Sequence, residues 1–323
     1  MNRIKYALMT AVMGATLFAA AGCGHAAAGP NKIPMSTKPH DGRVSGYRLL
    51  HPPNLPSDVK LYQINYWSDH HQVEALMTEP TRAGHYPLLV NLHGGAIWPQ
   101  PHWNFGYTPS GVAALTDSAV VQLYPEYQGY LGSSGPTKGI RTDYINAYDA
   151  IRIAQEFGEV KPRATYLLGY SLGGGLALML AGVDPAVQAV VGVSPTVGLH
   201  DQAAWALSHP AVAAREGPFL REAFQLQPIY GTNVSSPAYQ LRSPHPRSIH
   251  APVLLLQGTA DQEVAWQPVY LFYQQMQKAH RAVKLVLYPG GHHGLHGKYA
   301  TQSVQQIHRW FAQYGLDIPS SDV

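Results

Sequence analysis

Gly169-Tyr170-Ser171-Leu172-Gly173 is the stretch that decides the fold of this chain. It follows a short apolar run at 165–168 and opens a helix-like run from Leu172 to Ala181. A strand, a sharp turn and a helix are the context in which G-x-S-x-G forms a nucleophile elbow, with the serine hydroxyl exposed at a strained turn. That hydroxyl is a weak nucleophile unless an adjacent base activates it. We therefore predict that Ser171 is a catalytic nucleophile, with a carboxylate and a histidine following it in the chain.

An acidic residue follows a later apolar strand. Residues 253–257 predict a buried strand, and Asp261 lies in the loop just after it. A carboxylate in that position can orient an imidazole. Asp261 could instead close a turn, because aspartate favours turns through its local hydrogen bonds. Glu263 is a second acidic residue in the same loop, and we interpret it as a solvated charge.

Two histidines follow the last predicted strand. The run 284–288 leads into Pro289-Gly290-Gly291-His292-His293-Gly294. His292 and His293 cannot both face the serine, so one of them is interpreted as a surface or packing residue. In a parallel sheet the serine, the carboxylate and the histidine all lie beyond the carboxyl ends of their strands, where ligands of open α/β sheets bind.

A glycine-rich turn after an earlier strand completes the predicted chemistry. The strand at 87–92 ends at His93-Gly94-Gly95-Ala96. Acyl transfer builds negative charge on a carbonyl oxygen, and each backbone amide held near it lowers the barrier by about 3 to 4 kcal/mol. We predict that Gly95 or Ala96 supplies one amide of this oxyanion hole and that Leu172 supplies the other. The alternative is a simple glycine turn.

Apolar runs alternate with helical patterns along most of the chain, and hydrophobic residues make up 46% of it. This alternation predicts one α/β domain over residues 46–323, with a mostly parallel eight-stranded sheet and helices on both faces. The strands are expected at 61–66, 73–78, 88–92, 119–123, 165–168, 189–193, 253–257 and 284–288. The helices are expected at 142–157, 172–181, 266–279 and 303–314.

From about Gln72 to Tyr314 the chain resembles the α/β-hydrolase catalytic domain of the prolyl oligopeptidase family, in the branch of dipeptidyl and acylaminoacyl peptidases. The resemblance rests on His93-Gly94-Gly95, residues 124–132, Gly169 to Gly173, residues 251–258 with Asp261, and Tyr288-Pro289-Gly290 leading to His293-Gly294. It implies an α/β-hydrolase fold with a catalytic triad of Ser171, Asp261 and His293. The family's catalytic histidine directly precedes a glycine, a condition that His293 meets and His292 does not.

Two departures from the family bear on the substrate. Only about fifty residues lie between the predicted signal peptide and the resemblance, too few for the β-propeller that family peptidases usually carry, and Gln128 replaces the family's usual arginine. The resemblance implies a serine hydrolase that cleaves ester or peptide bonds through an acyl-enzyme. A carboxylesterase is the alternative to a peptidase. A non-catalytic ligand-binding lipoprotein is a second alternative.

The alternation breaks down over residues 194–250, where proline, alanine and polar residues mix with aromatic ones. We predict that this segment is a small cap over the acyl pocket with roughly two short helices; the alternative is an ordinary surface excursion. Trp98, after the oxyanion turn, and Tyr170, beside the serine, are candidate pocket residues. Trp103 and Phe105 could line the same pocket or belong to the core.

The amino-terminal segment predicts where the protein is located in the cell. Arg3 and Lys5 precede an apolar stretch at 6–21 that ends at Ala20-Ala21-Gly22-Cys23. This pattern predicts a signal peptide over 1–23 with a lipobox-like end, lipidation of Cys23, and a tether over 24–45. The protein would then be secreted or held in the cell envelope, anchored to the bacterial membrane by lipid. The alternative is ordinary secretion after cleavage near the alanines at 26–28.

Charge and motif content exclude several other partners. The formal net charge of +3 falls to +1 without Arg3 and Lys5, which leaves no basic footprint for nucleic acid. The 17 histidines lack the H-E-x-x-H spacing of a zinc site, and no G-x-G-x-x-G opens a βαβ unit. Cys23 is the only cysteine, so no intramolecular disulfide can form. We predict no metal and no cofactor, with a small-molecule ester or short peptide as the substrate.

Overall fold

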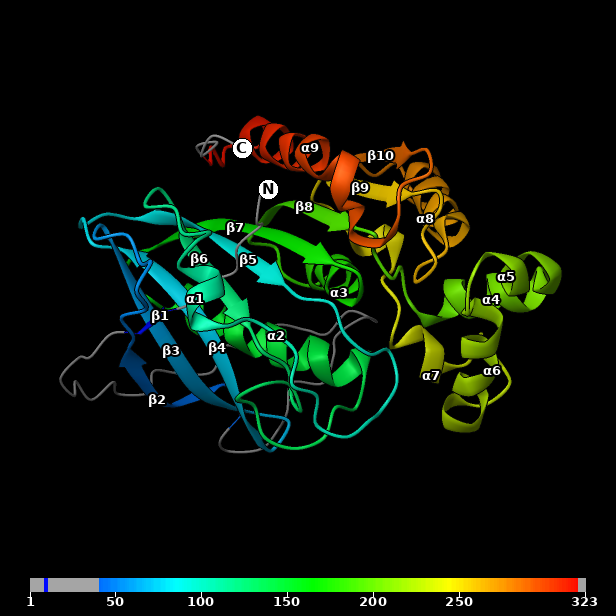
Figure 1. The fold of residues 1–323 in the computed structure, drawn as a ribbon, viewed down its shortest axis with the longest axis horizontal. Coiled ribbons are helices and arrows are strands. Elements are labelled where there is room, and N and C mark those ends of the chain that lie inside the picture. The colour runs from blue at the N-terminus through cyan, green and yellow to red at the C-terminus, as the bar shows by residue number, and fades with distance from the viewer. Residues whose placement is uncertain (1–8, 11–40, 319–323) are drawn as a thin grey trace.

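The computed structural model describes residues 9, 10 and 41–318, and one large sheet with helices on both faces runs through it (Figure 1). Cys23 and nearly all of the predicted signal peptide and tether lie outside the described residues. The strands are β1 Met9–Thr10, β2 Arg43–Leu49, β3 Val59–Ser68, β4 His71–Pro80, β5 Tyr86–Leu92, β6 Val121–Pro125, β7 Val160–Tyr170, β8 Val187–Val193, β9 Val253–Gly258 and β10 Val283–Tyr288.

The strands follow the order β1-β3-β4-β6-β5-β7-β8-β9-β10, and β2 pairs with β3. From β6 to β10 all pairings are parallel, whereas β4 is antiparallel to both β3 and β6. The eight predicted strands are therefore present, but the count of eight is too low because β1 and β2 add two antiparallel strands. β2 begins at Arg43, so the segment assigned to the tether already enters the sheet before residue 45.

The helices are α1 Pro109–Val112, α2 Ile140–Gln155, α3 Leu172–Ala181, α4 Leu199–Ser208, α5 Pro210–Glu216, α6 Phe219–Tyr230, α7 Pro237–Gln240, α8 Trp266–Lys278 and α9 Ala300–Gln313. The short 3₁₀ turns are η1 Pro246–Ser248, η2 His293–Leu295 and η3 Gly297–Tyr299. Within the described ranges, none of the helices has the length and apolar character that a bilayer span requires.

Alternation along the central strands divides the core into two layers, because successive side chains of a strand point to opposite faces. In β9, Val253 and Leu255 join one cluster with residues of α2, α3 and α8. Leu254 and Leu256 join the other cluster, which α9 covers. All four side chains are fully buried. Burial on both faces explains why these strands are continuous apolar runs in the sequence.

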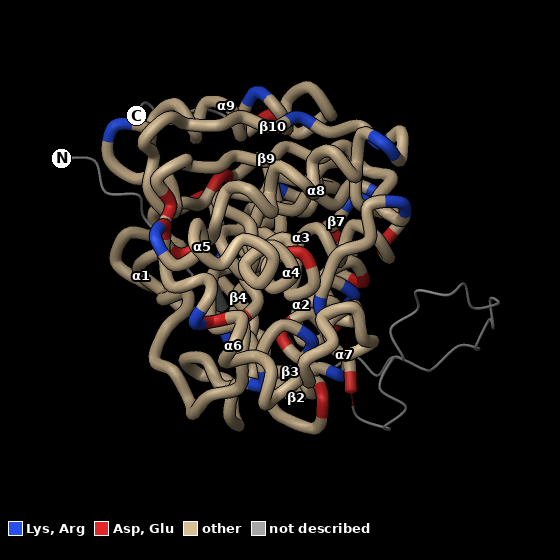
Figure 2. The backbone as a smooth tube through the Cα atoms, turned by 90° about the vertical axis from the view of Figure 1, so that its right-hand side faces the viewer, with Lys and Arg blue, Asp and Glu red and all other residues tan. Residues whose placement is uncertain are grey.

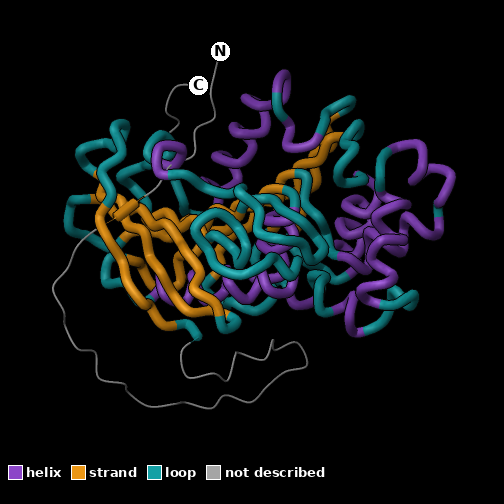
Figure 3. The backbone as a smooth tube through the Cα atoms, turned by 60° about the horizontal axis from the view of Figure 1, so that its bottom comes forward, coloured by secondary structure: helices purple, strands orange, loops and turns teal. Residues whose placement is uncertain are grey.

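The segment 194–250, here called the cap segment, leaves the sheet after β8 and returns at β9. It contains α4, α5, α6 and α7, four helices where two were predicted. These helices lie together beyond the ends of the central strands (Figures 1 and 3). Acidic and basic residues are interspersed on that side of the molecule (Figure 2). The cap segment is thus placed beside the sheet edge that carries the predicted site.

Candidate active site

Ser171 occupies the single position between the end of β7 and the start of α3. Its backbone has φ 53° and ψ −121°, a conformation that non-glycine residues rarely adopt. The Ser171 amide donates to the Val193 carbonyl at 2.9 Å, and its own carbonyl accepts from the Gly174 amide at 3.0 Å. These bonds fix the turn and present the side chain at its tip.

The glycine on the helix side of the elbow is required by close packing. A Cβ atom at Gly173 would lie 2.1 Å from the carbonyl oxygen of Leu92. The first turn of α3 therefore packs directly against the end of β5, where the predicted oxyanion turn begins. This approach brings the serine and that turn together.

Asp261 lies in the loop after β9 and is 4% exposed. Its carboxylate accepts from Nδ1 of His293 at 2.9 Å to Oδ2 and 3.1 Å to Oδ1. It also accepts from the backbone amides of Glu263 at 2.9 Å and Val264 at 2.8 Å, and from Nε2 of Gln257 at 3.0 Å. Every oxygen of this buried carboxylate is thus satisfied, and the imidazole is held by one edge.

Hydrogen bonds and charges within the Asp261–His293 pair favour an ionised carboxylate and a protonated imidazole. Burial acts to raise the pKa of Asp261, but the hydrogen bond and charge of His293 and two backbone amides lower it overall. Burial acts to lower the pKa of His293, but the hydrogen bond and charge of Asp261, with the charge of Glu263, raise it overall. The site therefore stabilises an imidazolium, which is the form that a histidine takes after it accepts a proton.

Hydrogen bonds between strand ends bring the histidine loop toward the serine. Ser194, the first residue after β8, donates its amide to the Leu256 carbonyl at 2.8 Å. Its Oγ accepts from the backbone amide of Gly294 at 3.0 Å. The pocket described below is lined by both Ser171 and Glu263, and Glu263 Oε2 lies 3.7 Å from Nε2 of His293.

The two adjacent histidines have different environments. His292 is exposed, and its Nδ1 lies 3.2 Å from the Ala260 carbonyl, whereas His293 contacts Asp261. Of the two acidic residues in the loop, Asp261 is the buried partner, while the Glu263 side chain is 73% exposed.

The predicted oxyanion turn contacts Ser171. A Cβ atom at Gly94 would lie 3.3 Å from the Cβ of Ser171. Nδ1 of His93 lies 2.6 Å from the Gly94 carbonyl, and this nitrogen must donate because a carbonyl can only accept. The C=O and N–H of a trans peptide point in opposite directions, so the Gly95 amide points away from the His93 ring. The Ala96 amide is engaged elsewhere and donates to the hydroxyl oxygen of Tyr130 at 2.9 Å.

A buried acid behind this turn was missed from the sequence. Glu126 is fully buried, with Oε2 3.3 Å from Nε2 of His93, and it accepts from the Tyr107 amide at 2.5 Å. Burial raises the pKa of this carboxyl group. The His93 ring also stacks on Tyr127, with 4.1 Å between centroids. An acid inside the otherwise apolar and aromatic run Tyr124-Pro125-Glu126-Tyr127 was the available signal.

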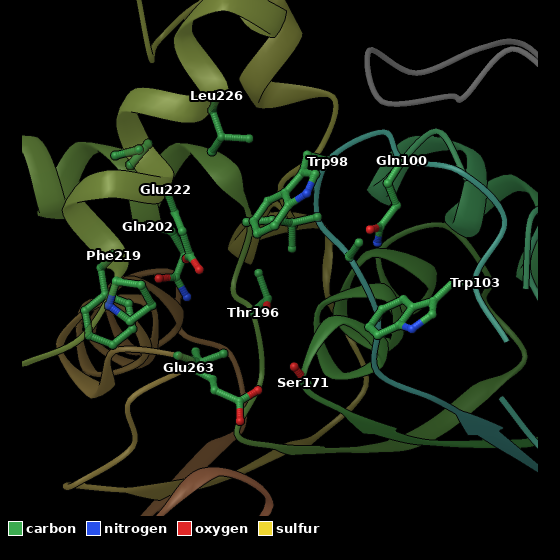
Figure 4. A pocket seen from close by; sticks show the side chains of 17 residues that line it. Trp98, Gln100, Trp103, Ser171, Thr196, Gln202, Phe219, Glu222, Leu226 and Glu263 are labelled. Atoms are coloured by element: carbon green, nitrogen blue, oxygen red, sulfur yellow. The ribbon is translucent and has the colours of Figure 1, made fainter. Parts of the chain in front are cut away.

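A pocket of about 260 Å³ opens beside Ser171, between the oxyanion turn and the cap segment (Figure 4). Trp98 lines it, and so does Trp103, on which Phe105 stacks with 5.1 Å between ring centroids. Tyr170 does not: it packs against the core layer under α9. The other labelled lining residues are Gln100, Thr196, Gln202, Phe219, Glu222, Leu226 and Glu263. In the part of the chain that the structure describes, no group of three or more metal-ligating side chains could hold a metal ion.

Comparison with known proteins identifies the family to which this fold and site belong. The family model described as "Prolyl oligopeptidase family" matches residues 138–316, more than half of the chain. The chain is also similar to the uncharacterized peptidase YtmA of Bacillus subtilis, with 28% identity over 263 residues that cover 80% of this chain and 95% of the relative.

Two solved structures share the fold. Acylaminoacyl peptidase of Pyrococcus horikoshii superposes with a TM-score of 0.63 at 14% identity, covering 81% of this chain and 43% of the peptidase. Acetyl xylan esterase 1 of Thermoanaerobacterium superposes with a TM-score of 0.62 at 16% identity, covering 84% of this chain and 88% of the esterase. The chain thus has the α/β-hydrolase fold and spans less than half the length of the acylaminoacyl peptidase.

Proposed function

We propose that this chain, which belongs to the prolyl oligopeptidase family and is a serine hydrolase, cleaves acyl bonds with Ser171, His293 and Asp261 as its catalytic triad. The observation that carries the proposal is the pair of hydrogen bonds, 2.9 and 3.1 Å, between His293 Nδ1 and the buried Asp261 carboxylate. Nε2 of His293 lies 3.7 Å from Oε2 of Glu263, which lines the same pocket as Ser171.

In the proposed reaction, Oγ of Ser171 attacks the carbonyl carbon of the substrate while Nε2 of His293 takes its proton. Asp261 keeps the imidazole in the orientation that this transfer needs and stabilises the imidazolium. The imidazolium then gives the proton to the leaving group, and the acyl group stays on Ser171 as an ester. A water molecule, deprotonated by His293, attacks that ester and releases the acid.

Two backbone amides are proposed to hold the oxyanion. Leu172 is the first residue of α3, and the first amides of a helix have no acceptor inside the helix. Gly95 is the proposed second donor, because the Gly94 carbonyl is turned toward His93. The Ala96 amide is already bonded to Tyr130, which favours Gly95 over Ala96 as that donor.

Carboxylic esters are the proposed first substrate class. An ester has a better leaving group than an amide and makes fewer demands on positioning. Peptide or aminoacyl amides are the second candidate, which the similarity to a relative described as a peptidase favours. The family membership argues against the non-catalytic lipoprotein as an alternative.

Fluorophosphonate labelling tests the proposal. The folded wild-type protein should be labelled covalently, and Ser171→Ala should not. Turnover of a panel of p-nitrophenyl esters and amino-acid p-nitroanilides would then separate the two substrate classes. A wild-type protein that is folded, unlabelled and inactive on the whole panel would contradict the proposed mechanism.

We also propose that the protein is held in the cell envelope by lipid on Cys23, a residue outside the described part of the chain. The apolar stretch ending at Ala20-Ala21-Gly22-Cys23 supports this. Metabolic labelling with a fatty-acid analogue should mark the wild-type protein but not Cys23→Ser. A label that persists in Cys23→Ser would contradict the proposal.

A further inference from the structure

Among the described residues that line the pocket beside Ser171, the charged ones are Glu222 and Glu263, with no lysine or arginine. Glu222 comes from α6 of the cap segment, and Glu263 from the loop after β9. In Figure 4 the Glu222 side chain extends from α6 into the pocket, while the Glu263 carboxylate lies on the same side as Ser171. Two separate parts of the chain thus contribute carboxylates to one cavity.

No basic side chain from residues 41–318 lines the pocket with the Glu222 carboxylate. Its neighbour Arg221 lines a different groove, with Leu220 and Phe224, on the outer face of α6. Burial raises the pKa of Glu222, and the charge of Glu263 raises it further against the opposing effect of Arg221. A cation bound in the pocket would offset both the desolvation of the Glu222 carboxylate and its repulsion by Glu263.

The uncharged residues that line the pocket also suit a cationic ligand. Trp98 and Phe219 present aromatic rings to the pocket, and aromatic faces attract cations. Nε2 of Gln202 is buried and has no hydrogen-bond partner within residues 41–318. In Figure 4 Gln202 and Glu222 are both among the labelled residues that line the pocket. A buried amide nitrogen without an acceptor is costly, so a ligand that supplies an oxygen there would be favoured.

We propose that this pocket selects acyl substrates whose acyl group carries a protonated amine, with Glu222 and Glu263 as the residues that determine the specificity. This inference rests on the proposed function, because it assumes that the pocket holds the acyl group attacked by Ser171. The amine would lie between the two carboxylates, and a carbonyl or hydroxyl oxygen of the substrate would accept from Gln202.

Two p-nitrophenyl esters of equal chain length test the selectivity. The heptanoate and the 6-aminohexanoate differ in one terminal group, a methyl in the first and an ammonium in the second. The wild-type protein should have a kcat/KM for the cationic ester about tenfold higher than for the neutral one, which corresponds to one partly desolvated ion pair. Raising the ionic strength should reduce that ratio, because salt screens the attraction.

Variants assign the effect to the carboxylates. Glu222→Gln should reduce the ratio about fivefold, and Glu222→Lys should reverse the preference. Glu156→Gln, at a carboxylate of α2 whose side chain is 76% exposed, is the matched control and should leave the ratio unchanged. The inference would be overturned if the wild-type enzyme hydrolysed the cationic and neutral esters with equal kcat/KM. A preference for the cationic ester that persisted in Glu222→Lys would also overturn it.

A binding measurement separates this inference from the proposed reaction. In titration calorimetry, Ser171→Ala should bind n-hexylammonium more tightly than n-hexanol. Adding Glu222→Gln to the same variant should remove this difference in affinity. This result would support the cation site even if the wild-type protein hydrolysed neither ester. Equal binding of the two probes would overturn the cation site while leaving the triad intact.

Discussion

The backbone amide of Ala96 donates a hydrogen bond of 2.9 Å to the hydroxyl oxygen of Tyr130, a residue 34 positions further along the chain. The same hydroxyl group faces Gly95, where an added Cβ atom would lie 2.3 Å from it. Tyr130 is fully buried, and its ring packs against His93 at 5.1 Å between centroids. Tyr130 and His93 therefore each form a hydrogen bond with the backbone of this turn, and neither bond uses the Gly95 amide, the proposed donor to the oxyanion.

Tyr130→Phe should loosen the oxyanion turn without removing the ring that packs beneath it. We expect kcat to fall about tenfold with little change in KM, because the lost hydrogen bond positions a donor that acts in the transition state. Steady-state kinetics on one ester measures both constants. Tyr47→Phe, at a residue of β2 that is 44% exposed, is the control. An equal rise in KM with unchanged kcat would argue against a positioning role.

Asp261→Asn should reduce kcat by about 10³- to 10⁴-fold, because the imidazole loses the carboxylate that orients it and stabilises its charge. Circular dichroism would establish that the variant is folded. His292→Ala is the matched control and should be mild, since that side chain is exposed and contacts the Ala260 carbonyl. If His292→Ala reduced kcat as strongly as Asp261→Asn, the choice of His293 over His292 would be wrong.

The pH profile should report the His293 imidazole. The neutral imidazole is the active base, and the pKa of His293 is raised above its ordinary value of 6.5. The acidic limb of the kcat/KM profile should therefore have its midpoint above pH 6.5, with activity lost as the pH falls through it.

Glu263→Gln should move that midpoint to lower pH, because the charge of Glu263 contributes to the raised pKa of His293. The matched control is again Glu156→Gln, which should leave the midpoint in place. A midpoint that stays fixed or rises in Glu263→Gln would show that this carboxylate does not act on the imidazole.

Gly173→Ala should be strongly destabilising, because the new methyl group would lie 2.1 Å from the backbone oxygen of Leu92. We expect the free energy of unfolding to fall by about 3 kcal/mol or more, at the upper end for overpacking. Gly158→Ala adds the same methyl group where no atom lies within 4 Å, and it should change stability by less than about 1 kcal/mol. Urea unfolding curves compare the two. Equal midpoints would refute the close-packing explanation.

The residues that the sequence predicts for the triad share a local signature. Ser171 follows a buried strand and is flanked by glycines, and Asp261 follows another apolar strand directly. Strands buried on both faces are continuous apolar runs, so their ends can be located from the sequence. His293 was the exception, because choosing between two adjacent histidines required the family pattern.

The parts that were missed depend on contacts between distant segments. The choice between Gly95 and Ala96 depends on Tyr130, and the role of Glu222 depends on how α6 packs over the pocket. Neither contact leaves a periodic pattern in the sequence. β2 was overlooked because most of its residues are exposed, so its side chains lack the alternation that marks a half-buried strand.

The cap segment leaves and rejoins the sheet at two directly paired strands, since Val193 at the end of β8 lies opposite Leu256 of β9. Both strands belong to the core that also holds the nucleophile and the acid. Because the segment joins two adjacent parallel strands of one sheet, a longer or shorter insert between them leaves the strand register unchanged. Exchange of helices α4 to α7 would thus reshape the wall of the pocket, provided that Ser194 stays in place, because its hydroxyl accepts from the Gly294 amide next to His293.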